Sequence, residues 1–252
     1  PDNLKSQVTA LAEFLKTKAD SIKVPRALVI ADANAPPEQM RDAKIVSDWA
    51  SDAHARAGVN CSDCHSVKTE PDRFIAAPGI ETCKGCHSKQ ALTFTEGRHG
   101  MRQREGLLAS NDGPFGLFKA VKLAPMTPSQ ARLPMKSDAA HEALACNTCH
   151  SAHRYDVKAA SVTACTGCHD DAHTKAYFTS KHYDLFNREL KEALPAGSGV
   201  SCATCHMPRE IHRGEQGDRV LAQHNQNMNL RPNEKMVRSV CLNCHGLGLA
   251  ID

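Results

Sequence analysis

Residues 146–182 read "CNTCHSAHRYDVKAASVTACTGCHDDAHTKAYFTSKH" and contain one pattern twice, two cysteines separated by two residues and followed directly by histidine. The pattern occurs six times in the chain and uses all twelve cysteines. The six C-x-x-C-H motifs consist of Cys61, Cys64 and His65; Cys83, Cys86 and His87; Cys146, Cys149 and His150; Cys165, Cys168 and His169; Cys202, Cys205 and His206; and Cys241, Cys244 and His245.

The histidine that follows every cysteine pair decides the chemistry of these motifs. A zinc ribbon or a redox dithiol needs the two cysteines but no histidine directly after them. The recurrence of that histidine therefore predicts covalently attached haem c, with two thioether bonds to the porphyrin and the histidine as proximal ligand of the iron. We expect six haem c groups, which leave no cysteine for a disulfide or a metal cluster.

The composition agrees with a core made of cofactors. Aromatic residues are only 4% of the chain and the mean hydropathy is −0.44, which is a thin apolar supply for 252 residues. We expect a mainly α fold with extensive coil, wrapped around six covalently bound haems. The formal charge of +3 omits the haem propionates; with them the holoprotein is at about −3, so the basic pI does not indicate a nucleic-acid partner.

The pattern of apolar residues predicts how the chain is organised. Residues 1–45 contain no haem motif and are predicted to form a helical N-terminal segment, with an amphipathic helix over residues 3–19. Residues 46–252 are predicted to form one hexahaem cytochrome domain. A second helix is expected over residues 182–193, and strands are expected to be scarce. No run of eighteen apolar residues is present, so we expect no membrane-spanning helix. Because c-type haem is attached outside the energised membrane, the protein is predicted to be periplasmic or extracellular, its signal peptide lying outside this numbering.

Eight histidines remain after the proximal ones, and six irons need a second axial ligand. His153 and His173 follow their own proximal histidines by three and four residues, so on a helix they lie on the same side of their own haem. Each is therefore expected to bind a neighbouring haem or to donate a hydrogen bond to a haem propionate. Low-potential haems with two histidine ligands are the expected state. The candidate distal ligands are His54, His99, His141, His153, His173, His182, His212 and His224.

A resemblance to a known family rests on the opening stretch. The stretch resembles the hydroxylamine oxidoreductase-like family of multihaem cytochromes in the order of its motifs. That order is C-x-x-C-H-x-x-H-R-aromatic, then a spacer, then A-C-x-x-C-H followed closely by an acidic residue and a histidine, and finally S-K-H. The segment "GVSCATCHMPREIH" (199–212) is similar to the same family. The resemblance implies a catalytic haem attached at His150 with an open distal side, and a pocket lined by Asp171 and His182. Full members of the family carry eight haems, whereas this chain has six motifs.

Three functions follow from these observations. The first is electron transfer through six haems, mostly or all with two histidine ligands, between redox partner proteins. The second is reduction of nitrite, hydroxylamine or a similar small nitrogen species at an open haem attached at His150, with His182 and Asp171 as the catalytic residues. The third is a homo-oligomer in which the chain is a subunit of a conductive cytochrome filament, with His54 binding iron across the junction. The position of His182 distinguishes the first two.

Overall fold

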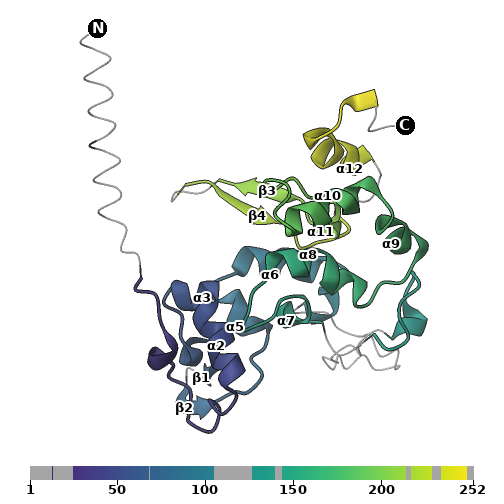
Figure 1. The fold of residues 1–252 in the computed structure, drawn as a ribbon. Coiled ribbons are helices and arrows are strands. Elements are labelled where there is room, and N and C mark those ends of the chain that lie inside the picture. The colour runs from purple at the N-terminus through teal and green to yellow at the C-terminus, as the bar shows by residue number, and fades with distance from the viewer. Residues whose placement is uncertain are drawn as a thin grey trace, which may run out of the picture. The chain divides into compact units, whose positions relative to one another are not determined.

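The computed structural model describes residues 13, 25–67, 69–104, 127–139, 144–213, 217–228 and 234–248 (Figure 1). The predicted helix over residues 3–19 and the candidate ligand His141 lie outside these ranges, except for Glu13, which is helical and exposed. The chain divides into two compact units, Pro1–Ala76 and Ala77–Asp252. The predicted division at residue 45 concerns haem content and stays a prediction.

The first unit contains one C-x-x-C-H motif within a small frame of helices. Its buried side chains include Trp49, whose indole Nε1 donates to the Val59 carbonyl at 3.1 Å, and Ala55. Gly58 has φ +79, and a Cβ there would lie 3.0 Å from that of Pro25, so this turn requires glycine. The elements are η1 (Ile30–Asp32), α2 (Ala43–Ser51), α3 (Ala53–Arg56), α4 (Cys61–His65), β1 (Ser66–Val67) and β2 (Glu70–Phe74).

The second unit contains the other five motifs on short helices joined by coil. The predicted helix over residues 182–193 is present as α10, which begins one residue earlier and ends at Leu190. The elements are α5 (Ile80–Lys84), α6 (Ser88–Glu96), η2 (Met101–Gln103), η3 (Pro128–Gln130), α7 (Cys146–Cys149), α8 (Val157–Thr166), α9 (Ala172–Tyr177), α10 (Lys181–Leu190), α11 (Cys202–His206), β3 (Arg209–His212), β4 (Arg219–Ala222), α12 (Glu234–Ser239) and η4 (Cys241–Asn243).

Sheet structure is limited to two antiparallel hairpins in the described residues. Strands β1 and β2 pair with an irregularity between Ser66 and Val67, and β3 pairs with β4 in register from Arg209 opposite Ala222 onward. The expectation of a mainly helical fold with much coil and few strands is confirmed. No helix among the described residues is long and apolar enough to cross a membrane.

Side chains alone form a small core. The buried apolar residues of the described ranges are Trp49, Ala55, Ala91, Phe94, Ala139, Val162, Phe186 and Val240. Three of the eight are alanines, and none of the large ones is completely shielded from solvent. A chain of this length ordinarily buries far more apolar surface. The small core agrees with an interior that is built around cofactors.

Candidate haem-binding sites

Each C-x-x-C-H motif is wound into a helical turn. The backbone N–H of the histidine donates to the carbonyl of the first cysteine at 2.8 Å in His87, 3.0 Å in His150, 2.9 Å in His169 and 2.8 Å in His245. Residues i, i+3 and i+4 share one face of such a turn. The two sulfurs and the imidazole therefore lie on the same side, as attachment to one porphyrin requires. No disulfide joins any of the twelve cysteines, so both sulfurs of every motif are available for a porphyrin.

The residues around the cysteines explain why these turns form. Asn60 caps α4, its side chain accepting from the Cys61 N–H at 2.8 Å, and Asp63 inside the motif accepts from the Asn60 N–H at 2.7 Å. Ser201 and Thr204 form the same reciprocal arrangement at α11, with N–H to hydroxyl distances of 3.0 and 3.2 Å. Such caps satisfy backbone donors that a five-residue helix would otherwise leave unpaired.

Within the second unit, four proximal histidines each face a histidine from elsewhere in the chain. An iron held by an imidazole nitrogen about 2 Å away on each side places the two ring centroids about 6 Å apart. The interplanar angles range from 48° to 72°, while the separations differ by only 0.2 Å (6.2 minus 6.0). A constant separation at variable angle is what a shared central atom imposes, so these residues fit haem iron. The centroid distances are 6.1 Å for His99 and His169, 6.2 Å for His150 and His224, 6.1 Å for His173 and His206, and 6.0 Å for His182 and His245.

The protonation of these rings also suits a metal. Burial lowers the pKa of His150, His169, His206 and His224 below the usual value for histidine. For the first three, the next contribution is the facing imidazole, which disfavours a second positive charge. A neutral imidazole is the form that binds a metal.

Hydrogen bonds at Nδ1 orient the rings of several histidines. The Nδ1 atom of His224 bonds the Ala222 carbonyl at 2.9 Å, and that of His99 bonds Gln226 Oε1 at 2.9 Å. The Nδ1 atom of His65 bonds the Ile75 carbonyl at 2.6 Å. Such bonds fix the tautomer and the ring orientation of a metal ligand.

Three candidate ligands share one local design, in which the histidine is the second residue of a helix behind its N-cap. Asp52 accepts from the His54 N–H at 2.8 Å and Asp171 accepts from the His173 N–H at 3.0 Å. Ser180 caps α10, which carries His182, by accepting from the Tyr183 N–H at 3.2 Å. The recurring sequences D-A-H and S-K-H are the signal of this design, which sequence reasoning did not recognise as a cap.

The carboxylate oxygens of Asp171 are therefore occupied by hydrogen bonds at the start of α9 and do not point into an open pocket as free acceptors. Its Oδ1 accepts from the backbone N–H of His173 and, at 3.1 Å, of Thr174, and its Oδ2 accepts from the Thr174 hydroxyl at 2.8 Å. Burial alone would raise the pKa of this carboxyl, but these hydrogen bonds together hold the pKa below its usual value. The carboxylate is thus the N-cap of α9.

The structure does not bring His182 to the haem site at His150. The ring that faces His150 belongs to His224, and His182 faces His245. His212 turns its Nε2 toward Glu210 Oε2 at 3.9 Å, which is an orientation unlike that of the other candidates. His153 is half-buried beyond α7.

A comparison with known families supports the cofactor. Residues 54–92 match a family described as a doubled CXXCH motif, a span that covers the first two C-x-x-C-H motifs. This match indicates covalently bound haem c and a multihaem c-type cytochrome, a class of protein that is typically exported. No curated protein and no solved structure matches the chain.

Proposed function

We propose that this chain carries electrons through six covalently attached haems whose irons are all held by two histidines. The observation that carries the proposal is the set of four imidazole pairs at 6.0–6.2 Å, each joining a proximal histidine to a histidine from outside its motif. An iron with both axial positions filled exchanges single electrons and offers no site for a substrate. The proximal ligands are the histidines of the six motifs.

His54 and His153 are assigned to the irons at His65 and His87. His54 shares the capped-helix design of His173 and His182, and the buried Asp52 carboxylate lies 3.0 Å from its Nδ1. A carboxylate behind a histidine is a recurrent arrangement at metal sites, because it raises the basicity of the ligand and fixes its ring. His153 is the remaining candidate in the described part of the chain, and it lies in the coil that follows α7. His212 is not assigned, because its Nε2 faces Glu210.

Contacts between successive motifs support an electron path through the second unit. The Cys146 sulfur lies within hydrogen-bonding reach of Cys83, and the Cys165 sulfur within the same reach of Cys202. The remaining neighbours are Cys149 with Cys168, and Cys205 with Cys241 and Cys244. The thiols stand in for the thioether sulfurs at the porphyrin edges. The second to the sixth motif therefore follow one another in space in the order of the sequence.

The reductase hypothesis requires an open iron at His150, and the facing ring of His224 opposes it. Asp171 is engaged as a helix cap and His182 lies at another motif, so neither lines a pocket at His150. The carrier would act outside the cytoplasm, in the periplasm or beyond it, and exchange electrons with redox partner proteins.

Two measurements test this function. A pyridine haemochrome assay on the purified protein should give six haems per chain, and a smaller number would contradict the cofactor count. The His224→Ala variant should convert one low-spin haem to a high-spin haem in the EPR spectrum, because its iron loses a ligand. The matched His212→Ala variant should leave every haem low-spin. An unchanged low-spin spectrum of His224→Ala would remove the axial assignments.

A further inference from the structure

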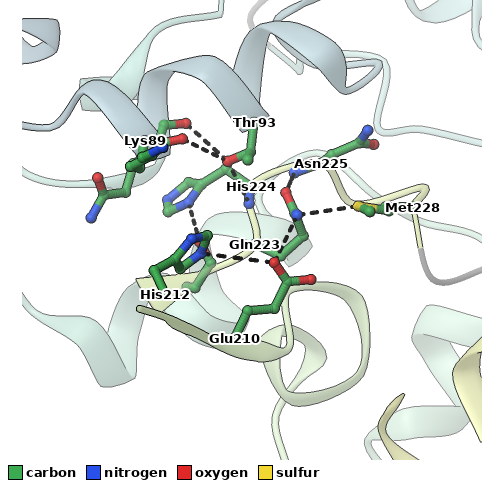
Figure 2. A network of polar contacts seen from close by, with 10 residues as sticks. Lys89, Thr93, Glu210, His212, Gln223, His224, Asn225 and Met228 are labelled. Carbon is green, nitrogen blue, oxygen red and sulfur yellow. Dashed lines mark hydrogen bonds and ion pairs between the residues drawn. The ribbon is translucent and has the colours of Figure 1, made fainter. Parts of the chain in front are cut away.

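Residues 222–228 begin at the last residue of β4 and pack against the end of α6 in the second unit. The backbone N–H of His224 donates to Thr93 Oγ1 at 3.2 Å (Figure 2). The Thr93 hydroxyl itself donates to the backbone carbonyls of Lys89 and Gln90, one turn earlier in α6, at 3.2 Å. A Cβ placed on Gly97, at the end of α6, would lie 3.0 Å from the Asn225 Cα. The two chain segments thus approach each other at backbone distance, which glycine alone permits without a shift.

Gln223 holds this segment together from inside. Its side chain is only 4% exposed. Its Nε2 donates to Glu210 Oε2 at 3.2 Å and lies 3.2 Å from the Met228 sulfur, while its Oε1 accepts from the Asn225 N–H at 3.0 Å (Figure 2). Buried amides with all these contacts filled are costly to displace. The two chain neighbours of His224, Gln223 and Asn225, are therefore both held by hydrogen bonds, and together they fix the position of His224.

The same segment holds a second imidazole. Gln226 Oε1 accepts a hydrogen bond from Nδ1 of His99 at 2.9 Å, although the two residues are 127 positions apart. His99 faces His169, whereas His224 faces His150. The haem sites at His150 and His169 are neighbours, because Cys149 interacts with Cys168.

We propose that residues 222–228 act as a brace that positions the distal ligands of two neighbouring haems, with Gln226 as the positioning residue for His99. This inference rests on the proposed function, since it takes both imidazoles as iron ligands. The strength of the acceptor at Nδ1 controls how basic the ligand is, and second-shell hydrogen bonds of this kind tune the potential of haem iron. The brace therefore sets the potential of the haem at His169 as well as the ligand geometry.

Two substitutions of Gln226 test whether it tunes the haem at His169, because they should shift its reduction potential in opposite directions. The Gln226→Glu variant offers a charged acceptor to His99, which stabilises the ferric state and lowers the reduction potential of one haem in a spectroelectrochemical titration. The Gln226→Leu variant removes the acceptor and raises that potential. Both variants remain low-spin by EPR. The matched changes Gln39→Glu and Gln39→Leu, at an exposed position of the first unit, leave all potentials in place.

A purely structural role for Gln226 would move the potential in the same direction in both variants, and that result, or no movement in either, overturns the proposal. The His99→Ala variant separates this failure from that of the proposed function, because loss of an iron ligand yields one high-spin haem. If His99→Ala stays low-spin, the axial assignment itself is wrong.

The shared brace also predicts a linked effect of bulk at Gly97. The Gly97→Val variant pushes its side chain against Asn225 and displaces both ligands, so the high-spin EPR signal accounts for two haems. A signal from one haem, or none, would show that His99 and His224 are held independently.

Discussion

Replacing Asp171 by alanine removes the cap of α9, the helix that carries His173. The lost side chain accepts two backbone N–H groups and one hydroxyl at distances of 2.8–3.1 Å. Loss of an N-cap costs about 1–2 kcal/mol. Because α9 spans only Ala172–Tyr177, most of this cost falls on the first turn, where His173 lies. A destabilisation of this size raises the population of the detached ligand by roughly 5- to 30-fold.

The assay is the rate at which carbon monoxide binds to the reduced protein, since the gas can enter only after a histidine leaves the iron. We expect Asp171→Ala to accelerate one kinetic phase by the same factor. The Asp171→Asn variant should bind at the rate of the unmodified chain, because asparagine caps a helix about as well as aspartate. Asp170→Ala is the matched control, as the Asp170 carboxylate is partly exposed and makes a surface ion pair with Lys175 at 3.1 Å.

The comparison of alanine with asparagine decides between two roles for Asp171. A proton donor in an active site fails in both variants, whereas a helix cap fails only in alanine. If Asp171→Asn accelerates carbon monoxide binding as much as Asp171→Ala does, the capping argument is refuted.

Three further predictions follow from the structure. A chain produced without haem attachment should be unfolded by circular dichroism and rapidly digested by protease, because its apolar side chains form too small a core; protease resistance of that form would contradict the cofactor core. The His54→Ala variant should show one high-spin haem by EPR, and an all-low-spin spectrum would remove His54 as a ligand. Backbone N–H groups of Gly197 and Gly199 hold the pKa of Glu189 below its usual value. Its carboxylate therefore stabilises the fold above about pH 4.3, and this stabilisation is lost as the pH falls toward the lower folded pKa. Melting curves of Glu189→Gln should accordingly show a weaker loss of stability on acidification, and an unchanged acid slope would exclude this role.

The sequence predicted the haem motifs and the kind of fold because both depend on local patterns. The turn that joins Cys146 to His150 needs only five residues. His173 faces His206, but it does not share a helix with His169, because α9 begins only at Ala172 behind its cap Asp171. The helical spacing from which its placement was argued is therefore absent. Which histidine faces which motif depends on how distant segments fold together. The pairing of His182 with His245 arises in this way, and no spacing in the sequence indicates it.

At Asp171, the role implied by the family resemblance differs from the role of the residue in the structure. The resemblance implied a pocket acid, whereas the fold uses the carboxylate to begin a helix. The same residue type serves both roles, and only the partners of its oxygens distinguish them. The repeated D-A-H and S-K-H sequences are the signal that Asp171 is a helix cap. An N-cap followed by a histidine at the second helical position occurs three times in the described residues.

The most direct test of the bis-histidine electron carrier is an EPR spectrum of the fully oxidised protein, recorded before and after addition of nitrite. The two-histidine arrangement predicts low-spin signals from all six haems and no change with nitrite. A high-spin signal that shifts when nitrite is added would show an open iron and contradict the assignment of two histidine ligands to every haem.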